Sequence, residues 1–164
     1  MRATWAPKGR TPVLRHHLRN WTRLSMSGAL GYAPDGAEAW LVFAMRWGTY
    51  NDESLIEFLT ELRVHLGGDK VTLIWDGLQA HRSRAMRAWL RTQRHWLVVE
   101  QLPAYGHDLN PIELVWGNVK SRELANLCAD TIEEAAFHAD AGLERVGNDT
   151  ELCLSFLRHT GLSL

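Results

Sequence analysis

The chain has 164 residues, of which 46% are hydrophobic and 23% charged, and its formal net charge at pH 7 is −1. These values predict one soluble globular domain, and the charge argues against a self-sufficient DNA-binding domain, which would be more basic. No apolar run approaches the roughly 18 residues that span a bilayer, and no signal peptide is visible. We therefore expect a cytoplasmic protein without a membrane segment.

The charge is unevenly distributed. Residues 2–23 contain six basic side chains and no acid, whereas residues 129–151 are acidic. Residues 1–20 have proline and glycine but no periodicity, so we expect a basic, irregular arm. Within it, Lys8 and Arg10 are candidate DNA contacts, and a solvated arm is the equally weighted alternative.

Two strands and a helix are expected before residue 70. Residues 22–31 and 38–47 alternate between apolar and polar positions around the turn signal Pro34-Asp35-Gly36, which predicts an antiparallel hairpin. Residues 54–66 place leucines on one helical face, after a cap at Asn51-Asp52.

The second half alternates strands and helices. Strands are expected at 71–75 and 96–99, around a helix at 83–94. A helix capped by Asn110 should run to about Leu127, a capping box at Thr131 should open another, and a last one should cover 150–158. This order predicts an α/β fold with a mixed sheet flanked by helices.

Two carboxylates stand out in this pattern. Asp76 ends the strand 71–75, and Glu113 lies in the first turn of the helix that follows Asn110. Such groups can converge on a hard cation such as Mg²⁺. The alternatives without a metal are structural: Asp76 could cap the turn at the strand end, and Glu113 could simply occupy the first helical turn, where the helix dipole favours a negative charge.

The surrounding blocks are Trp75-Asp76-Gly77, Ala80 to Ser83, Leu102 to Tyr105, and Asp108 to Glu113 followed by Val115, Trp116 and Lys120. Together they resemble the catalytic core of the IS630/Tc1/mariner transposases, which are DDE-type enzymes with an RNase H-like fold. The last block is long and specific. The resemblance covers nearly the whole chain, so residues 1–164 are interpreted as a partial DDE transposase core.

The resemblance implies DNA cleavage and strand transfer with two Mg²⁺ or Mn²⁺ ions, for which Asp76 and Glu113 would be two of three acidic ligands. The family's first catalytic aspartate lies on a strand upstream of the segment that Arg2 to Pro12 matches. We therefore expect an N-terminally truncated core that lacks this strand and exposes unpaired sheet edges.

Other residues are weaker candidates. His81 occupies a position of the family motif and could support the site. A histidine that is hydrogen-bonded within the fold or faces solvent, without a role in the site, is an equally weighted alternative. Asp108 and Asn110 could also support it, although turn chemistry and N-capping are favoured. Arg84, Arg87 and Arg91 share a helix face that could contact phosphates, with a solvated face slightly favoured, and Lys120 is a further candidate.

Two functions remain open. The chain is either the catalytic part of a transposase, completed by the product of an upstream reading frame, or a catalytically inactive remnant with at most weak nucleic-acid binding. DNA is the expected partner in the first case, and a homodimer is a further candidate assembly.

Overall fold

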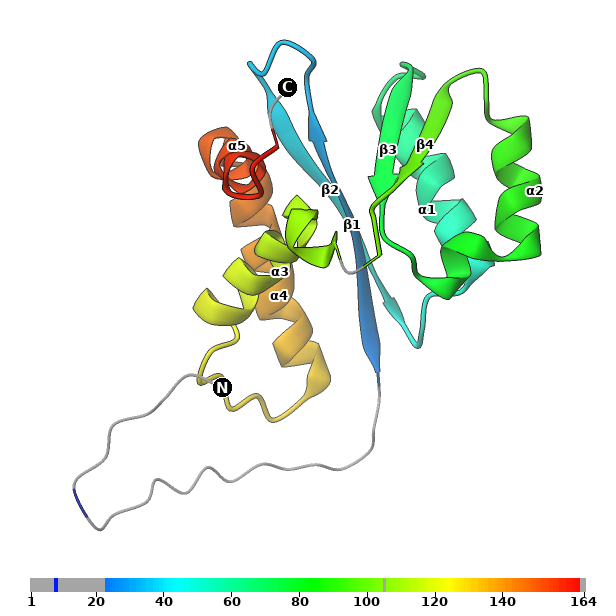
Figure 1. Cartoon of the computed structure of the whole chain (residues 1–164). Helices are drawn as coiled ribbons and strands as arrows, with labels where there is room; N and C mark the ends of the chain where they lie inside the picture. Colours follow the sequence, from blue (N-terminus) through cyan, green and yellow to red (C-terminus); the bar gives the residue numbers. More distant parts are fainter. Residues whose placement is uncertain (1–7, 9–22, 105, 163–164) are drawn as a thin grey trace.

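The computed structural model describes residues 8, 23–104 and 106–162, which form five α-helices and four strands (Figure 1). Of the basic arm expected at residues 1–20, only Lys8 belongs to this part, where it is exposed, and Arg10 lies outside the described residues. None of the described helices is both long and apolar enough to cross a membrane.

The first two strands form the predicted antiparallel hairpin. Strand β1 (Leu24–Tyr32) pairs antiparallel with β2 (Ala39–Trp47), with Tyr32 opposite Ala39. In the turn, Oδ1 of Asp35 accepts a hydrogen bond from the backbone N–H of Ala37 at 3.0 Å, and Gly36 adopts a φ of +69°. Asp35 is thus used by the turn, as expected.

Beside the hairpin lies a unit with a parallel strand pair. Helix α1 (Asp52–His65) is followed by β3 (Val71–Trp75), the short 3₁₀ helix η1 (Gln79–Arg82), α2 (Arg84–Thr92) and β4 (Leu97–Gln101). Strands β3 and β4 are parallel, as expected when a helix connects them.

The two helices of this unit bury the apolar side of β3. Leu59 and Leu62 of α1 pack against Trp75 of β3 and Met86 of α2 in one core cluster. Helix α2 begins at an N-cap where the Ser83 side chain accepts from the N–H of Met86. The cap explains why α2 starts where the sequence predicts.

The remaining helices cover the hairpin. Helices α3 (Pro111–Arg122), α4 (Ile132–Gly147) and α5 (Thr150–His159) surround a second core cluster with β1 and β2. Helix α3 ends at Arg122, five residues before the predicted end at Leu127, and the chain then turns through Asn126, whose φ is +63°. A positive φ cannot continue a right-handed helix.

The capping box predicted at Thr131 is only half formed. The Thr131 side chain accepts from the N–H of Glu134, but Glu134 accepts from the N–H of Asp130 instead of Thr131. The carboxylate satisfies a backbone donor one residue earlier, so the helix still begins at the expected place.

The α/β class is confirmed, and the strands form two separate two-stranded sheets. One sheet is β1 with β2, and the other is β3 with β4. Within the described part of the chain, no strand pairs with the second edge of β1 or of β3. The cavity described next lies between these two sheets.

Candidate active site

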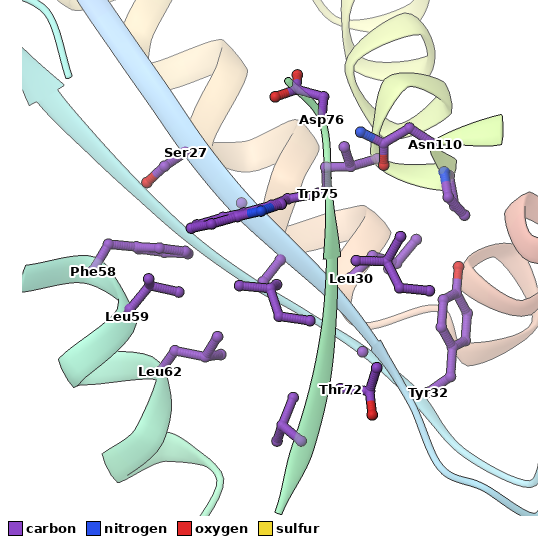
Figure 2. A pocket seen from close by; sticks show the side chains of 18 of the residues that line it. Ser27, Leu30, Tyr32, Phe58, Leu59, Leu62, Thr72, Trp75, Asp76 and Asn110 are labelled. Atoms are coloured by element: carbon purple, nitrogen blue, oxygen red, sulfur yellow. The ribbon is translucent and has the colours of Figure 1, made fainter. Parts of the chain in front are cut away.

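A cavity of about 1250 Å³ lies between the two sheets. We call it the inter-sheet cavity. It is lined by residues 26–32 of β1, residues 71–76 of β3 and its end, the inner face of α1, and residues 109–113 at the start of α3 (Figure 2). Asp76, His81, Asn110 and Glu113 all line it. The structure thus places both predicted acids and two of the predicted supporting residues on the wall of one cavity.

Asp76 follows the last residue of β3, and its side chain is 49% exposed. Its Oδ1 accepts from the N–H of Leu78 at 3.0 Å and lies 3.1 Å from Nδ1 of His81. The hydrogen bond from Leu78 gives Asp76 the strand-end turn role that the sequence analysis named as the alternative. Asp76 has this role and also lines the cavity. Because both contacts use Oδ1, Oδ2 is the oxygen best placed to bind a ligand.

Nδ1 of His81 lies near both the side-chain carboxylate and the backbone carbonyl of Asp76. Besides its contact with the carboxylate, Nδ1 lies 3.2 Å from the backbone carbonyl of Asp76. Its ring stacks on Trp75, with centroids 4.1 Å apart and planes 4° apart. The imidazole is therefore held between the strand end and the aspartate.

Asn110 and Glu113 come from the start of α3. Asn110 occupies the N-cap position and Pro111 the first helical position, as predicted, but the Asn110 side chain makes no capping hydrogen bond. The amide is instead part of the cavity wall, at the same end as Asp76 (Figure 2). Glu113 is exposed in the first turn, where the helix dipole favours its negative charge.

Other predicted residues lie outside the cavity. Asp108 is exposed and faces His107, with Nε2 and Oδ1 3.2 Å apart. Lys120 is exposed on α3, about 10 Å along the axis from Glu113 at 1.5 Å per residue. Arg84, Arg87 and Arg91 are exposed on α2, opposite the buried Met86.

Sequence reasoning missed two polar groups of the cavity wall. The indole N–H of Trp75 and the hydroxyl of Ser27 are buried and have no hydrogen-bond partner in the described structure. Both residues line the cavity. The signal for Trp75 was its place directly before Asp76 in a buried strand, whereas nothing in the local sequence marked Ser27.

Tyr32 also lines the cavity, on the side of Thr72 and away from Asp76 (Figure 2). Its hydroxyl donates to the backbone carbonyl of Cys153 at 3.2 Å. Burial, followed by the nearby Cys153 thiolate, raises the pKa of Tyr32 well above its usual value of 10, so the phenol stays neutral. Tyr32 therefore adds no charge to the cavity wall, whereas Asp69, Asp76 and Glu113 place carboxylates on it.

The donor set suits a hard cation but is small. Two carboxylates and the Asn110 amide oxygen match the oxygen ligands of Mg²⁺, which keeps several waters. Every aspartate and glutamate of the chain lies in the described part, and there no group of three or more His, Cys, Asp or Glu side chains could hold a metal.

The family model described as DDE superfamily endonuclease matches residues 1–135. The chain belongs to the DDE superfamily endonucleases. The matched range contains Asp76 and Glu113 of this DDE domain, together with both strand pairs.

Two solved structures are similar to this DDE domain. The catalytic domain of Mos1 transposase with raltegravir and Mg has 18% sequence identity and a TM-score of 0.47, covering 86% of this chain and 84% of that one. The catalytic domain of Mos1 mariner transposase has 16% identity and a TM-score of 0.45, covering 86% and 83%. No match was found among curated proteins.

Proposed function

We propose that this chain supplies two of the acidic ligands of a transposase site for metal-dependent cleavage and strand transfer of DNA, of the IS630/Tc1/mariner type. The observation that carries the proposal is that Asp76 and Glu113 line one cavity although they come from a strand end and a distant helix. Membership of the DDE superfamily endonucleases and the oxygen-only donor set support it.

Each residue has a distinct proposed task. Asp76 and Glu113 would hold Mg²⁺ or Mn²⁺, and the bound ion would lower the pKa of water and stabilise charge on the phosphate. Asn110 would orient a water or a phosphate oxygen by its amide. His81, through its contact with Oδ1, would keep the Asp76 carboxylate in one orientation.

The reaction would proceed at a phosphodiester bond of DNA. A water oxygen forms a bond to phosphorus, the bond from phosphorus to the 3′ oxygen breaks, and the 3′ oxygen takes up a proton. In strand transfer, the oxygen of the freed 3′ hydroxyl would bond to a second phosphorus, the bond from that phosphorus to its own 3′ oxygen would break, and this leaving oxygen would take up the proton. The complete site of two ions would draw its third carboxylate from outside this chain, in line with a product of an upstream reading frame.

The test combines metal binding with DNA nicking. Mn²⁺ binding is followed by electron paramagnetic resonance, and nicking by conversion of supercoiled plasmid in Mg²⁺ or Mn²⁺. Asp76→Asn and Glu113→Gln should each remove Mn²⁺ binding and any nicking. Glu100→Gln is the matched control, because Glu100 is exposed on β4 and does not line the cavity.

The alternative is a remnant without catalytic activity, supported by the lack, among the described residues, of any group of three His, Cys, Asp or Glu side chains that could hold a metal. It predicts neither specific Mn²⁺ binding nor nicking in the unaltered chain. Nicking that persists in both the Asp76 and Glu113 variants would overturn the proposed site. Mn²⁺ binding that depends on both residues would exclude the remnant.

A further inference from the structure

A smaller hollow lies at the other end of β3 from Asp76, where β3 and β4 start side by side (Figure 1). Its volume is about 240 Å³, and it is lined by residues 70–72, residues 94–96 and Val98. We call it the strand-start pocket. Lys70 and Asp76 are six residues apart along an extended chain, so about 20 Å separates this pocket from the first acid of the proposed site.

The wall of the strand-start pocket carries positive charge. Lys70 and Arg94 are exposed residues of this wall, and no described aspartate or glutamate lines it. The neighbouring Asp69 lines the inter-sheet cavity instead. None of the ion pairs of the described residues involves Lys70 or Arg94, and these residues include every aspartate and glutamate of the chain. Both cations are therefore left without a side-chain carboxylate partner.

The loop that carries Arg94 is held in one shape. The backbone carbonyl of Gln93 accepts from the N–H of Trp96 at 3.0 Å, and the Gln93 side-chain oxygen accepts from the indole N–H at 2.9 Å. Trp96 is only 3% exposed. Its own carbonyl accepts from the N–H of Val71 at 2.8 Å. This bond joins the loop of Arg94 to the residue after Lys70, so the two cations are carried by backbone segments that are fixed to each other.

The groups of the wall suit a phosphate. Phosphate oxygens accept hydrogen bonds, which an ammonium supplies as a compact charge and a guanidinium as a planar fork. Thr72 adds a hydroxyl to the same wall. The volume of about 240 Å³ is below the roughly 300–1,000 Å³ of pockets that enclose a whole small molecule. The pocket therefore has room for a phosphate group rather than for a complete nucleotide.

We propose that the strand-start pocket binds a phosphate group through Lys70 and Arg94, at a place separate from the proposed metal site. A phosphate of this kind has two sources, the backbone of DNA and inorganic phosphate in solution. Only the assignment to DNA rests on the proposed function. Phosphate binding itself depends on the two unpaired cations and on the fixed loop.

The position of the pocket determines which DNA phosphate it would hold. Phosphates of one strand follow each other at about 3.4 Å along the helix axis. The separation of about 20 Å from Asp76 therefore corresponds to roughly six nucleotides from the bond to be cleaved. A contact at this distance would hold the DNA at a second point and orient it along β3.

The first experiment titrates inorganic phosphate into the full chain at constant ionic strength and follows backbone amide signals by NMR. The amides of Lys70 and Arg94 should shift saturably, whereas that of the exposed His159 should not. Lys70→Gln and Arg94→Gln should each weaken binding roughly three- to tenfold, because each removes one charge-assisted contact. Arg122→Gln is the matched control, since Arg122 is exposed and lines neither cavity.

The second experiment identifies the source of the phosphate. Binding of a labelled duplex is measured by fluorescence anisotropy at several salt concentrations. If DNA supplies the phosphate, the double variant Lys70→Gln/Arg94→Gln should lower the slope of log affinity against log salt by about 1, which corresponds to one phosphate contact. An unchanged slope with loss of inorganic phosphate binding would assign the pocket to free phosphate.

Three results would overturn the inference: no saturable shift at Lys70 and Arg94, an equal shift at His159, or an equal loss of binding in Arg122→Gln. Failure of the proposed function gives a different result. If inorganic phosphate binds as expected while the unaltered chain neither binds Mn²⁺ nor nicks DNA, the phosphate site stands and the proposed function fails.

Discussion

The imidazole of His81 lies flat on the indole of Trp75, and the same ring contacts the carboxylate of Asp76. Trp75 ends β3 and is buried, so it gives the histidine a rigid surface. The side chain of His81 is only 12% exposed. This packing connects the core of the β3 unit to the orientation of the first acid of the site.

Replacing His81 should separate its contribution to stability, through stacking on Trp75, from its contribution to the orientation of the Asp76 carboxylate. His81→Ala should lower the free energy of unfolding by about 1 kcal/mol, because aromatic pairs contribute roughly 0.5–1.5 kcal/mol. His81→Phe keeps a stacking ring but loses both Nδ1 contacts, so it should retain stability while weakening Mn²⁺ binding at Asp76. Urea unfolding and Mn²⁺ titration measure the two effects. His95→Ala, at an exposed position, should change neither, and equal Mn²⁺ affinity in His81→Phe would contradict the positioning role.

Two glycines near the site should respond in opposite ways to a larger side chain. A Cβ on Gly28 of β1 would lie 2.8 Å from Cη2 of Trp116 and 3.3 Å from Cδ1 of Ile112. Gly28→Val should therefore overpack the contact with α3 and cost about 1–3 kcal/mol. A Cβ on Gly117 would meet no atom within 4 Å, so Gly117→Ala should stabilise α3 by roughly 0.5–1 kcal/mol. Urea unfolding checks both, and the same sign for the two variants would contradict the packing described.

An ion pair joins α3 to α4 at Arg145. Its Nε donates to Oε1 of Glu123 at 2.8 Å, and Nη2 donates to Oδ1 of Asn118 at 2.7 Å. The Glu123 side chain is only 18% exposed, and its second oxygen is buried without a partner. Arg145→Met should lower the unfolding free energy by about 1.5–3 kcal/mol, because it leaves that carboxylate uncompensated.

The exposed pair of Arg158 and Glu151 is the matched control for Arg145. The nitrogen-to-oxygen distance is 3.4 Å, and both side chains are largely in solvent. Arg158→Met should cost no more than about 1 kcal/mol, since surface ion pairs are weak. Equal losses in the Arg145 and Arg158 variants would show that burial does not distinguish the two pairs.

The arginines of α2 offer a test of the proposed DNA partner. Arg84, Arg87 and Arg91 are exposed on one helix, so a duplex could reach all three. Replacing the three by glutamine should reduce the slope of log affinity against log salt by about 3, at roughly 0.9 per phosphate contact. Fluorescence anisotropy with a labelled duplex measures it. The triple variant of the exposed residues Arg46, Arg122 and Arg158 should leave the slope unchanged, and an equal effect would remove α2 from the interface.

Local chemistry made most elements predictable. The Pro34-Asp35-Gly36 turn, the cap at Ser83 and the proline that opens α3 each act within a few residues, so their effects can be read along the chain. The end of α3 was placed five residues too late, because no proline or glycine marks it and the turn through Asn126 depends on a left-handed residue that the pattern did not indicate.

The sequence by itself determined the α/β order, the helix cap at Asn51 and the two candidate acids, because periodicity, turn residues and the motif blocks are local properties. Only the tertiary structure decided that Asp76 and Glu113 share one cavity, and that His81 stacks on Trp75 while Asp108 lies outside. It also decided which of the described strands pair with one another. Pairing and packing join residues far apart in the chain, so their outcome depends on how all elements fill space together.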